Sequence, residues 1–270
     1  MNSPNIPAAL VHYVAQGLIE RSVSIKILPT LMREISPAPL PKTYFVQAGL
    51  TATCAQWQLS DRANTSLPLL ERLKSTVGIG FTRQTWAQLS TGAAHQPAAQ
   101  LVFAPLVLDA AEDVLQALAC LPAWFADDGV LLFATLAAGG LPELVNAQPE
   151  WLELLGHWPS IMDAGARLQD LRFGLPVLDV EAVPLSYSDF NTTWHDVTAF
   201  VPALRHMDTA SAEPWKERLR HLFDNGLRDL SLQVLYGQVW QPTAPKSERT
   251  EHTVSLESLT AQLEHRRTFK

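Results

Sequence analysis

The residues that could do nucleophilic, metal or phosphate chemistry form no familiar set in this 270-residue chain. Eight histidines and two cysteines, Cys54 and Cys120, provide neither an HExxH pattern nor a closely spaced ligand set, so no metal site is predicted. The sequence has no Gly-x-Ser-x-Gly elbow of a hydrolase. Gly78 and Gly80 lack the third glycine of a dinucleotide-binding loop. Short motifs therefore do not indicate a function, and the order of the predicted helices and strands carries the remaining information.

The middle of the chain predicts a βαβ unit. Residues 100–108 favour a strand, 110–125 a helix, and 127–129 a turn. Residues 130–136 are fully apolar, which is typical of a strand at the centre of a parallel sheet. Three acidic residues, Asp109, Glu112 and Asp113, are interpreted as the N-terminus of the helix, where negative charge complements its dipole.

The later elements are predicted from apolar spacing. Helices are expected at 141–158, 163–171, 190–204 and 214–225. Two strands with alternating apolar residues, 177–187 and 230–240, are expected to pair as an antiparallel ribbon at one edge of the sheet.

The first half predicts a less regular succession. One or two helices are expected over 8–33, ended by the proline-rich stretch 37–41. A short buried strand is predicted at 43–48, closed by Gly49, and a second at 76–81. Shorter helices are expected at 53–59, 68–74 and 84–89, with polar breaks at 60–66 and 90–98.

Three segments resemble one protein family. They are DGVLLFATL at 128–136 with GLPEL at 140–144, then RFGLPVLDVE at 172–181 after Met162-Asp163, and VLYGQVWQP at 234–242. They are similar to motifs of the malonyl-acyl-carrier-protein O-methyltransferases of biotin biosynthesis, with Gln238 in place of the family's histidine. These enzymes belong to the class I S-adenosylmethionine-dependent methyltransferases.

The resemblance implies a Rossmann-like fold, a three-layer αβα sandwich with a mostly parallel, doubly wound sheet and an antiparallel C-terminal strand pair. It implies a methyltransferase-like domain over 1–242, with a helical N-terminal lid at about 1–36 and a helical insert at about 141–171. A polar linker and a C-terminal helix are expected over 243–270.

The cofactor half departs from the family. Such enzymes read acidic-x-Gly-x-Gly-x-Gly after the first strand, where the glycines let the backbone approach the cofactor. If that strand is 43–48, Gly49 is the one glycine left, and it is either a residual cofactor glycine or a turn. The acid expected after the second strand is replaced by Gly80, and the family's Ser-Asn pair by Ala104-Pro105. A third strand is expected to be missing, since only 90–98 separates neighbouring elements.

The resemblance places a vestigial cofactor pocket at six residues: Gly49, Thr51, Gly80, Phe81, Ala104 and Pro105. Tyr13 falls where the family has a tyrosine in its lid helix, so it is either a substrate contact or an ordinary packed or surface tyrosine. No catalytic residue is assigned. The expected cofactor is none, or weakly bound S-adenosylmethionine.

Composition narrows the function classes. The net charge of −7 and pI near 5.6 argue against a nucleic-acid-binding surface. The sequence predicts no signal peptide and no membrane span, and two cysteines without a disulfide pattern favour the cytoplasm.

Two hypotheses of different classes follow. In the first, the chain is a methyltransferase-like pseudoenzyme with a degenerate S-adenosylmethionine site that acts as a binding or scaffold protein, for which an unknown protein partner is one option. In the alternative, it is a divergent active O-methyltransferase that esterifies a malonyl thioester carboxylate on acyl carrier protein. A weaker third is a pocket adapted to another small molecule.

Overall fold

The computed structural model describes residues 6–23, 25, 29–38, 40, 41, 44, 45, 49, 53–59, 82–91, 99–111, 113–155 and 158–241. For strands β2 and β3 the description covers the backbone and the side chain of Cys54. The predicted helix at 68–74, the predicted strand at 76–81 and the expected C-terminal segment 243–270 lie outside the described residues.

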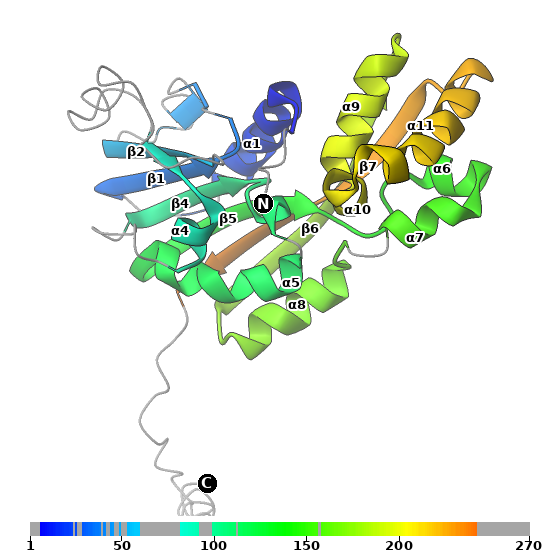
Figure 1. The fold of residues 1–270 in the computed structure, drawn as a ribbon. Coiled ribbons are helices and arrows are strands. Elements are labelled where there is room, and N and C mark those ends of the chain that lie inside the picture. The colour runs from blue at the N-terminus through cyan, green and yellow to red at the C-terminus, as the bar shows by residue number, and fades with distance from the viewer. Residues whose placement is uncertain are drawn as a thin grey trace, which may run out of the picture.

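In the part of the chain that the structure describes, seven strands form one sheet in the order β3-β2-β1-β4-β5-β7-β6 (Figure 1). They are β1 Leu31–Ser36, β2 Thr53–Leu59, β3 Thr82–Gln84, β4 Ala99–Pro105, β5 Phe125–Leu136, β6 Gly174–Ser186 and β7 Asp229–Trp240. The first five in that order are parallel, and β7 runs antiparallel between β5 and β6. The sheet is therefore doubly wound, with a C-terminal antiparallel ribbon.

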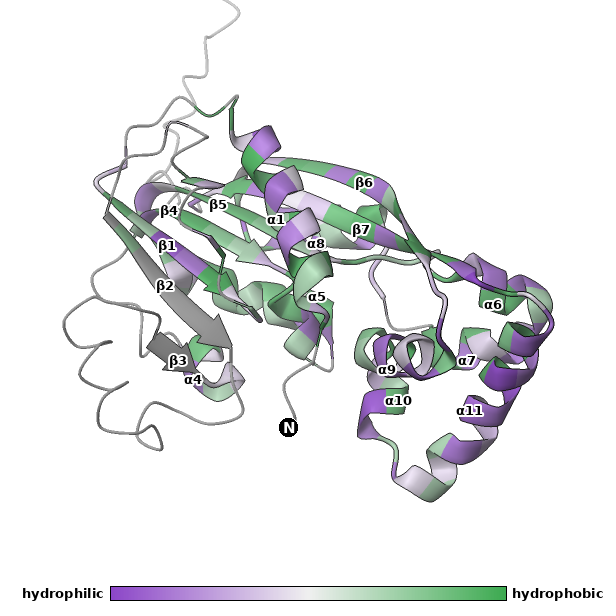
Figure 2. Ribbon diagram, turned by 90° about the horizontal axis from the view of Figure 1, so that it is seen from above, coloured by the Kyte–Doolittle hydropathy of each residue, from purple (hydrophilic) through white to green (hydrophobic). Residues whose placement is uncertain are grey.

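Helices cover both faces of this sheet. Helix α1, Ala8–Ser22, lies on one face, and α4 Trp86–Ser90, α5 Val114–Ala117 and α8 Ile161–Asp170 lie on the other (Figures 1 and 2). The 3₁₀ segments η2 Leu108–Ala110 and η3 Leu118–Trp124 flank α5. This is the three-layer arrangement that the sequence predicted.

A second group of helices follows the carboxyl ends of β5 and β6. It consists of α6 Pro142–Ala147, η4 Pro149–Trp151, α7 Leu152–Leu155, α9 Phe190–Phe200, α10 Pro202–His206 and α11 Thr209–Asp224. Figures 1 and 2 show these helices gathered at one end of the sheet, away from β2 and β3. This group is thus built from two connections, one after β5 and one after β6.

The core is divided by the sheet into two apolar clusters. Leu132 and Tyr236 belong to the cluster beneath α1, whereas Phe133 and Val239 belong to the cluster beneath α5 and α8. Because both faces of β5 are buried, residues 130–136 carry apolar side chains at nearly every position.

Close packing between β5 and β7 determines the residue type at position 237. A Cβ atom added to Gly237 would lie 2.2 Å from the Phe133 ring. The pairing of Phe133 with Gly237 therefore requires glycine at this position.

The predictions for the second half are largely confirmed. The strands at 177–187 and 230–240 form the predicted ribbon, and the helix at 163–171 corresponds to α8. The predicted helix at 141–158 is instead α6, η4 and α7, and the one at 110–125 is broken into η2, α5 and η3. Proline residues begin α6 and η4, and Pro122 lies inside η3, which explains these interruptions.

Three predictions for the first half are wrong. The helix expected through residue 33 ends at Ser22, so the helical lid is shorter than 1–36 and β1 occupies 31–36. The strand expected at 43–48 is not the first strand, since Tyr44 and Phe45 have helical conformation. The helix expected at 53–59 is β2, where Thr53–Leu59 extends the sheet.

The expected loss of a strand is also wrong, because β3 pairs with β2 at Thr82–Gln84 and completes a seven-stranded sheet. The error arose because β2 had been assigned to a helix. Among the described helices, none has the length and apolarity to cross a membrane.

Candidate functional site

The loop after β1 is organised by a buried carboxylate. Glu34 is 1% exposed, and its Oε1 accepts a hydrogen bond of 2.9 Å from the backbone N–H of Leu40. The Ser36 hydroxyl lies 2.6 Å from Glu34 Oε1 and 2.6 Å from the Ala38 carbonyl oxygen, so its one proton can be donated to either acceptor. The acid at the end of the strand thereby closes the loop that follows it.

The spacing in this loop is that of acidic-x-Gly-x-Gly-x-Gly. Counting from Glu34, the three glycine positions are occupied by Ser36, Ala38 and Leu40. The sequence prediction puts the motif at 45–51, about eleven residues further along the chain, because it includes the first residues of β1 in a helix. The acidic residue is present, whereas each glycine is replaced by a residue with a side chain.

The side chains beside this loop are packed into the core. Leu40 and Phe45 belong to the apolar cluster beneath α1, and the Phe45 ring lies 5.2 Å from that of Phe103 in β4. Gly49 has φ +73 and is exposed, and nothing lies within 4 Å of the position where its Cβ would be. This geometry fits the turn interpretation of Gly49, whose positive φ favours glycine.

The neighbouring strand β2 places residue Gln58 at the same edge. Gln58 of β2 pairs with Ser36 of β1, so the two lie side by side at the carboxyl end of the parallel strands. The next acid along the chain, Asp61, lies outside the described residues. Three predicted pocket residues, Thr51, Gly80 and Phe81, also lie outside them.

The end of β4 supplies the other two predicted pocket residues. Ala104 and Pro105 are the last residues of the strand, and both are buried. Ala104 contributes to the cluster beneath α5, on the sheet face opposite α1. Leu106 follows with φ 53 and is fully buried, a strained backbone position at the same edge as Glu34.

Asp109, interpreted from the sequence as a helix N-terminus, is a buried acid. Its Oδ1 accepts hydrogen bonds of 3.0 Å from the Thr135 hydroxyl and from the Leu136 N–H, and Oδ2 has no partner. Burial raises the pKa of Asp109 from 3.8 to about 7, partly offset by these bonds and by the charge of Arg205. The helix α5 is capped by Asp113, which accepts from the Gln116 N–H.

Arg205 joins the second group of helices to this edge. Its guanidinium donates to the carbonyl of Asp109 at 2.8 Å and to that of Ala199 at 2.7 Å. Burial lowers the pKa of Arg205, while the charge of Asp109 opposes that effect. The pair therefore couples α10 to the residues after β4.

Tyr13 lies on the rim of a cavity of about 400 Å³ between the first turns of α1, the end of β6 and α9, which we call the α1–α9 cavity. Its side chain is 48% exposed, and its hydroxyl donates to Glu181 Oε1 at 3.0 Å. That hydrogen bond raises the pKa of Tyr13, so the phenol stays neutral at physiological pH. Tyr13 therefore faces β6 rather than the loop after β1.

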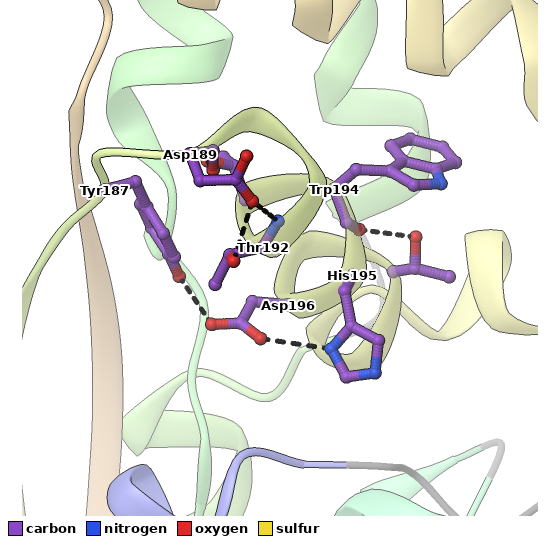
Figure 3. A network of polar contacts seen from close by, with 8 residues as sticks. Tyr187, Asp189, Thr192, Trp194, His195 and Asp196 are labelled. Carbon is purple, nitrogen blue, oxygen red and sulfur yellow. Dashed lines mark hydrogen bonds and ion pairs between the residues drawn. The ribbon is translucent and has the colours of Figure 1, made fainter.

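A polar network forms one wall of the α1–α9 cavity (Figure 3). Tyr187 donates to Asp196 Oδ2 at 3.2 Å, and the other oxygen of Asp196 lies 3.2 Å from Nδ1 of the exposed His195. Asp189 caps α9, the helix that carries His195 and Asp196, by accepting a hydrogen bond from the Thr192 N–H. Most of the other lining residues are apolar, among them Leu10, Val183 and Phe200.

Sequence reasoning missed Glu34, Asp109 and Arg205. The spacing of Glu34 to Ser36, Ala38 and Leu40 was a usable signal, since it repeats the acid-and-glycine pattern with substitutions. Nothing local marks Asp109 or Arg205, because their importance comes from contacts 27 and 96 residues away in sequence. Among the described residues, no group of three His, Cys, Asp or Glu side chains is placed to hold a metal ion.

Comparisons with known proteins agree on the fold. The YcgJ protein of Bacillus subtilis superposes with a TM-score of 0.50 at 12% identity, covering 86% of this chain and 100% of that one. No family model matches the chain. The chain has the α/β fold of the class I S-adenosylmethionine-dependent methyltransferases.

Two curated relatives indicate which methyltransferases of this class the chain resembles in sequence. The malonyl-[acyl-carrier protein] O-methyltransferase of Gallionella capsiferriformans is 26% identical over 266 residues, which span 88% of each chain. That of Nitrosospira multiformis is 24% identical over 217 residues, spanning 75% of this chain and 70% of that protein. This protein is a methyltransferase-like chain distantly related to the malonyl-acyl-carrier-protein O-methyltransferases.

The described residues fit S-adenosylmethionine poorly. Close approach of a ligand to the backbone requires positions without side chains, which is the role of glycines in such loops. Here Ser36 and Leu40 are buried, and Leu40 is part of the core beneath α1. Moving Leu40 aside to admit a ligand would expose an apolar side chain, at a cost of about 1.5–3 kcal/mol.

Proposed function

We propose that this protein is a binding protein derived from a methyltransferase, which retains the fold without a working cofactor loop. One observation carries the proposal: Ser36, Ala38 and Leu40 occupy the three positions where the glycine backbone of such enzymes approaches the cofactor. Glu34 still closes the loop through Leu40. The loop keeps its structural hydrogen bond, and side chains at these three positions would occupy space that a bound cofactor needs.

The position of Gln58 supports the same proposal. An acid at the end of the second strand would accept bonds from both ribose hydroxyls, whereas an amide carries no charge. Hydrogen bonds to charged groups are worth about 1.5–3 kcal/mol, so this replacement alone weakens binding by about tenfold or more.

The α1–α9 cavity is the part of the fold proposed to remain a binding site. It has a volume of about 400 Å³, apolar walls, and hydroxyl and carboxylate groups from Tyr13, Tyr187 and Asp196. Sites for small molecules usually combine an apolar lining with a few fixed polar groups. Its position at the second helical group places it on the side of the fold away from β2 and β3.

A second candidate is an active O-methyltransferase that esterifies the malonyl thioester carboxylate of acyl carrier protein. Two observations favour it: one relative is similar over 88% of both chains, and seven strands pair into one sheet over the described residues. The comparisons thus support the second candidate, while the geometry of the loop supports the first.

Calorimetric titration with S-adenosylmethionine and S-adenosylhomocysteine separates the two. The binding-protein proposal expects no saturable heat at ligand concentrations where the Gallionella capsiferriformans relative, titrated in parallel, saturates. Micromolar binding of either ligand would sink the proposal. A companion assay incubates the chain with malonyl-loaded acyl carrier protein and S-adenosylmethionine, and mass spectrometry looks for the methyl ester. Repeated formation of that ester would establish the second candidate.

A further inference from the structure

A second cavity, of about 520 Å³, lies at the other end of α1 and is here called the α1–β7 cavity. The α1–α9 cavity uses the first turns of α1, including Leu10, whereas the α1–β7 cavity uses its last turn, including Leu18 and Arg21. Its floor comes from β5 and β7, and one side from β6. Neither the loop after β1 nor the α1–α9 cavity contributes a residue to it.

Tyr236 belongs to its lining and carries a buried hydroxyl without a hydrogen-bond partner. Tyr236 is 1% exposed, and its hydroxyl makes no hydrogen bond. A Cβ atom on Gly17 would lie 2.8 Å from that oxygen, so the absence of a side chain on α1 makes room for it. An unsatisfied buried hydroxyl is unfavourable, and a ligand able to hydrogen-bond would recover that cost.

Charge in and around the cavity is negative. Arg21 lies 2.5 Å from Asp179 and 3.2 Å from Glu181, and its guanidinium carbon lies 3.8 Å from the centre of the Tyr236 ring. Glu20 is a further acid of the lining. The lining and its border thus carry three carboxylates and one guanidinium, and Asp179 remains about half exposed. A positively charged group is therefore favoured over an anion.

Apolar side chains border the same opening from two elements. Val23, just beyond α1, is 76% exposed, and Val177 of β6 is 58% exposed. Both line the α1–β7 cavity, together with the buried Leu18 and Leu132. A ligand with an apolar body would remove the two valines from water.

We propose that the α1–β7 cavity binds a small amphipathic amine. The protonated amino group lies beside Asp179 and Glu20, the Tyr236 hydroxyl supplies a hydrogen bond, and the apolar body lies between Val23 and Val177. This inference is independent of the proposed function, since it uses no residue of the cofactor edge.

The test uses the full chain with isotopically labelled Val and Leu methyl groups and hexylamine as the probe, followed by NMR. We expect saturable shifts at Val23, Val177 and Leu132. Hexanoate, of equal chain length and opposite charge, is expected to bind at least about tenfold more weakly, since tenfold is the effect of about 1.4 kcal/mol.

Two variants sharpen the test. Asp179→Asn removes a charge from an exposed side chain and is expected to weaken hexylamine binding about fivefold, which corresponds to about 1 kcal/mol, the upper value for an exposed ion pair. Tyr236→Phe removes only the unpartnered hydroxyl, so the fold is retained while affinity falls. Glu217→Gln removes an exposed acid on α11 and serves as the matched control, with unchanged affinity expected.

Four results overturn the proposal. Hexanoate binding as tightly as hexylamine would show that the carboxylates do not select charge. Shifts confined to Val183 and Leu185 would place the probe in the α1–α9 cavity. The absence of saturable shifts at millimolar hexylamine, or an Asp179→Asn variant that binds unchanged, would also reject the site.

Discussion

The backbone N–H of Leu40 donates to the buried carboxylate of Glu34 at 2.9 Å. This contact joins the end of β1 to the far end of the loop that follows it, over six residues. The acid of the cofactor motif therefore has a structural role that does not depend on a ligand. The presence of Glu34 is therefore consistent with either candidate function. The side chains at Ser36, Ala38 and Leu40 are the feature that favours the binding-protein proposal over the active methyltransferase.

Leu40→Ala is expected to lower the free energy of unfolding by about 2–5 kcal/mol, because Leu40 is buried in the cluster beneath α1 and the truncation leaves a cavity. Urea denaturation followed by circular dichroism measures the change. Val177→Ala, at an exposed apolar position, is the matched control and should stay within about 0.5 kcal/mol of the parent. Equal stability of the two variants would show that Leu40 is not part of the core.

Replacing Glu34 by alanine removes the acceptor of the Leu40 N–H in a buried setting. An unsatisfied buried donor costs about 1–3 kcal/mol, and the lost side-chain volume adds to this. Glu34→Gln keeps an acceptor oxygen at nearly the same place, so its loss of stability should be the smaller of the two. Urea denaturation of both variants measures the difference. If both substitutions cost the same, the hydrogen bond to Leu40 is not what the carboxylate contributes.

The difference between the two halves of the sequence has a physical cause. Residues 130–136 are nearly all apolar because both faces of β5 are covered. Residues 230–234 alternate because Leu230, Leu232 and Val234 are buried on one face of β7, while the residues between them are only partly buried. In β1, by contrast, Arg33 and Glu34 are both buried, so the strand shows neither pattern. A period-based interpretation joined its first residues, Leu31 and Met32, to the preceding helix.

The site was predicted less well than the fold for the same reason. With 43–48 taken as the first strand instead of β1, the acid-and-glycine pattern is predicted around Gly49 rather than at Ser36, Ala38 and Leu40. Asp109 precedes a helix, and an acid in that place is most often exposed. Its burial follows from the approach of Thr135 and Leu136 on β5, a tertiary contact that no local pattern encodes.

The stability of the protein should decrease as pH rises through the range set by Asp109. Its pKa is about 7 in the folded state and near 3.8 when unfolded, because burial disfavours the charged carboxylate. Between these values the folded state holds one proton more than the unfolded state, so the free energy of unfolding falls as pH rises and levels off above pH 7. A tenfold difference in proton affinity between the two states corresponds to about 1.4 kcal/mol.

Urea denaturation at several values between pH 4.5 and 8 tests this, with Asp109→Asn as the reference. The amide retains an oxygen for Thr135 and Leu136 and does not titrate, so the variant should gain on the parent as pH rises. The difference is expected to be at most about 4 kcal/mol across the range. Parallel curves for the two proteins would mean that Asp109 is ionised in the fold at all these pH values.

Gly237→Ala is expected to destabilise the protein by about 1–3 kcal/mol or more, because the added Cβ would lie 2.2 Å from the Phe133 ring in the centre of the sheet. The control is Gly165→Ala on α8, where the nearest atom to the new Cβ is a Leu178 methyl at an ordinary 3.5 Å. Alanine is the better helix former, so that variant should be unchanged or up to about 1 kcal/mol more stable. Combining Gly237→Ala with Phe133→Leu should recover part of the loss, since the smaller side chain relieves the contact and the two effects are then non-additive. Thermal denaturation of the parent, Gly237→Ala, Phe133→Leu, the double variant and Gly165→Ala decides the matter, and strictly additive losses would place the strain of Gly237→Ala somewhere other than the Phe133 ring.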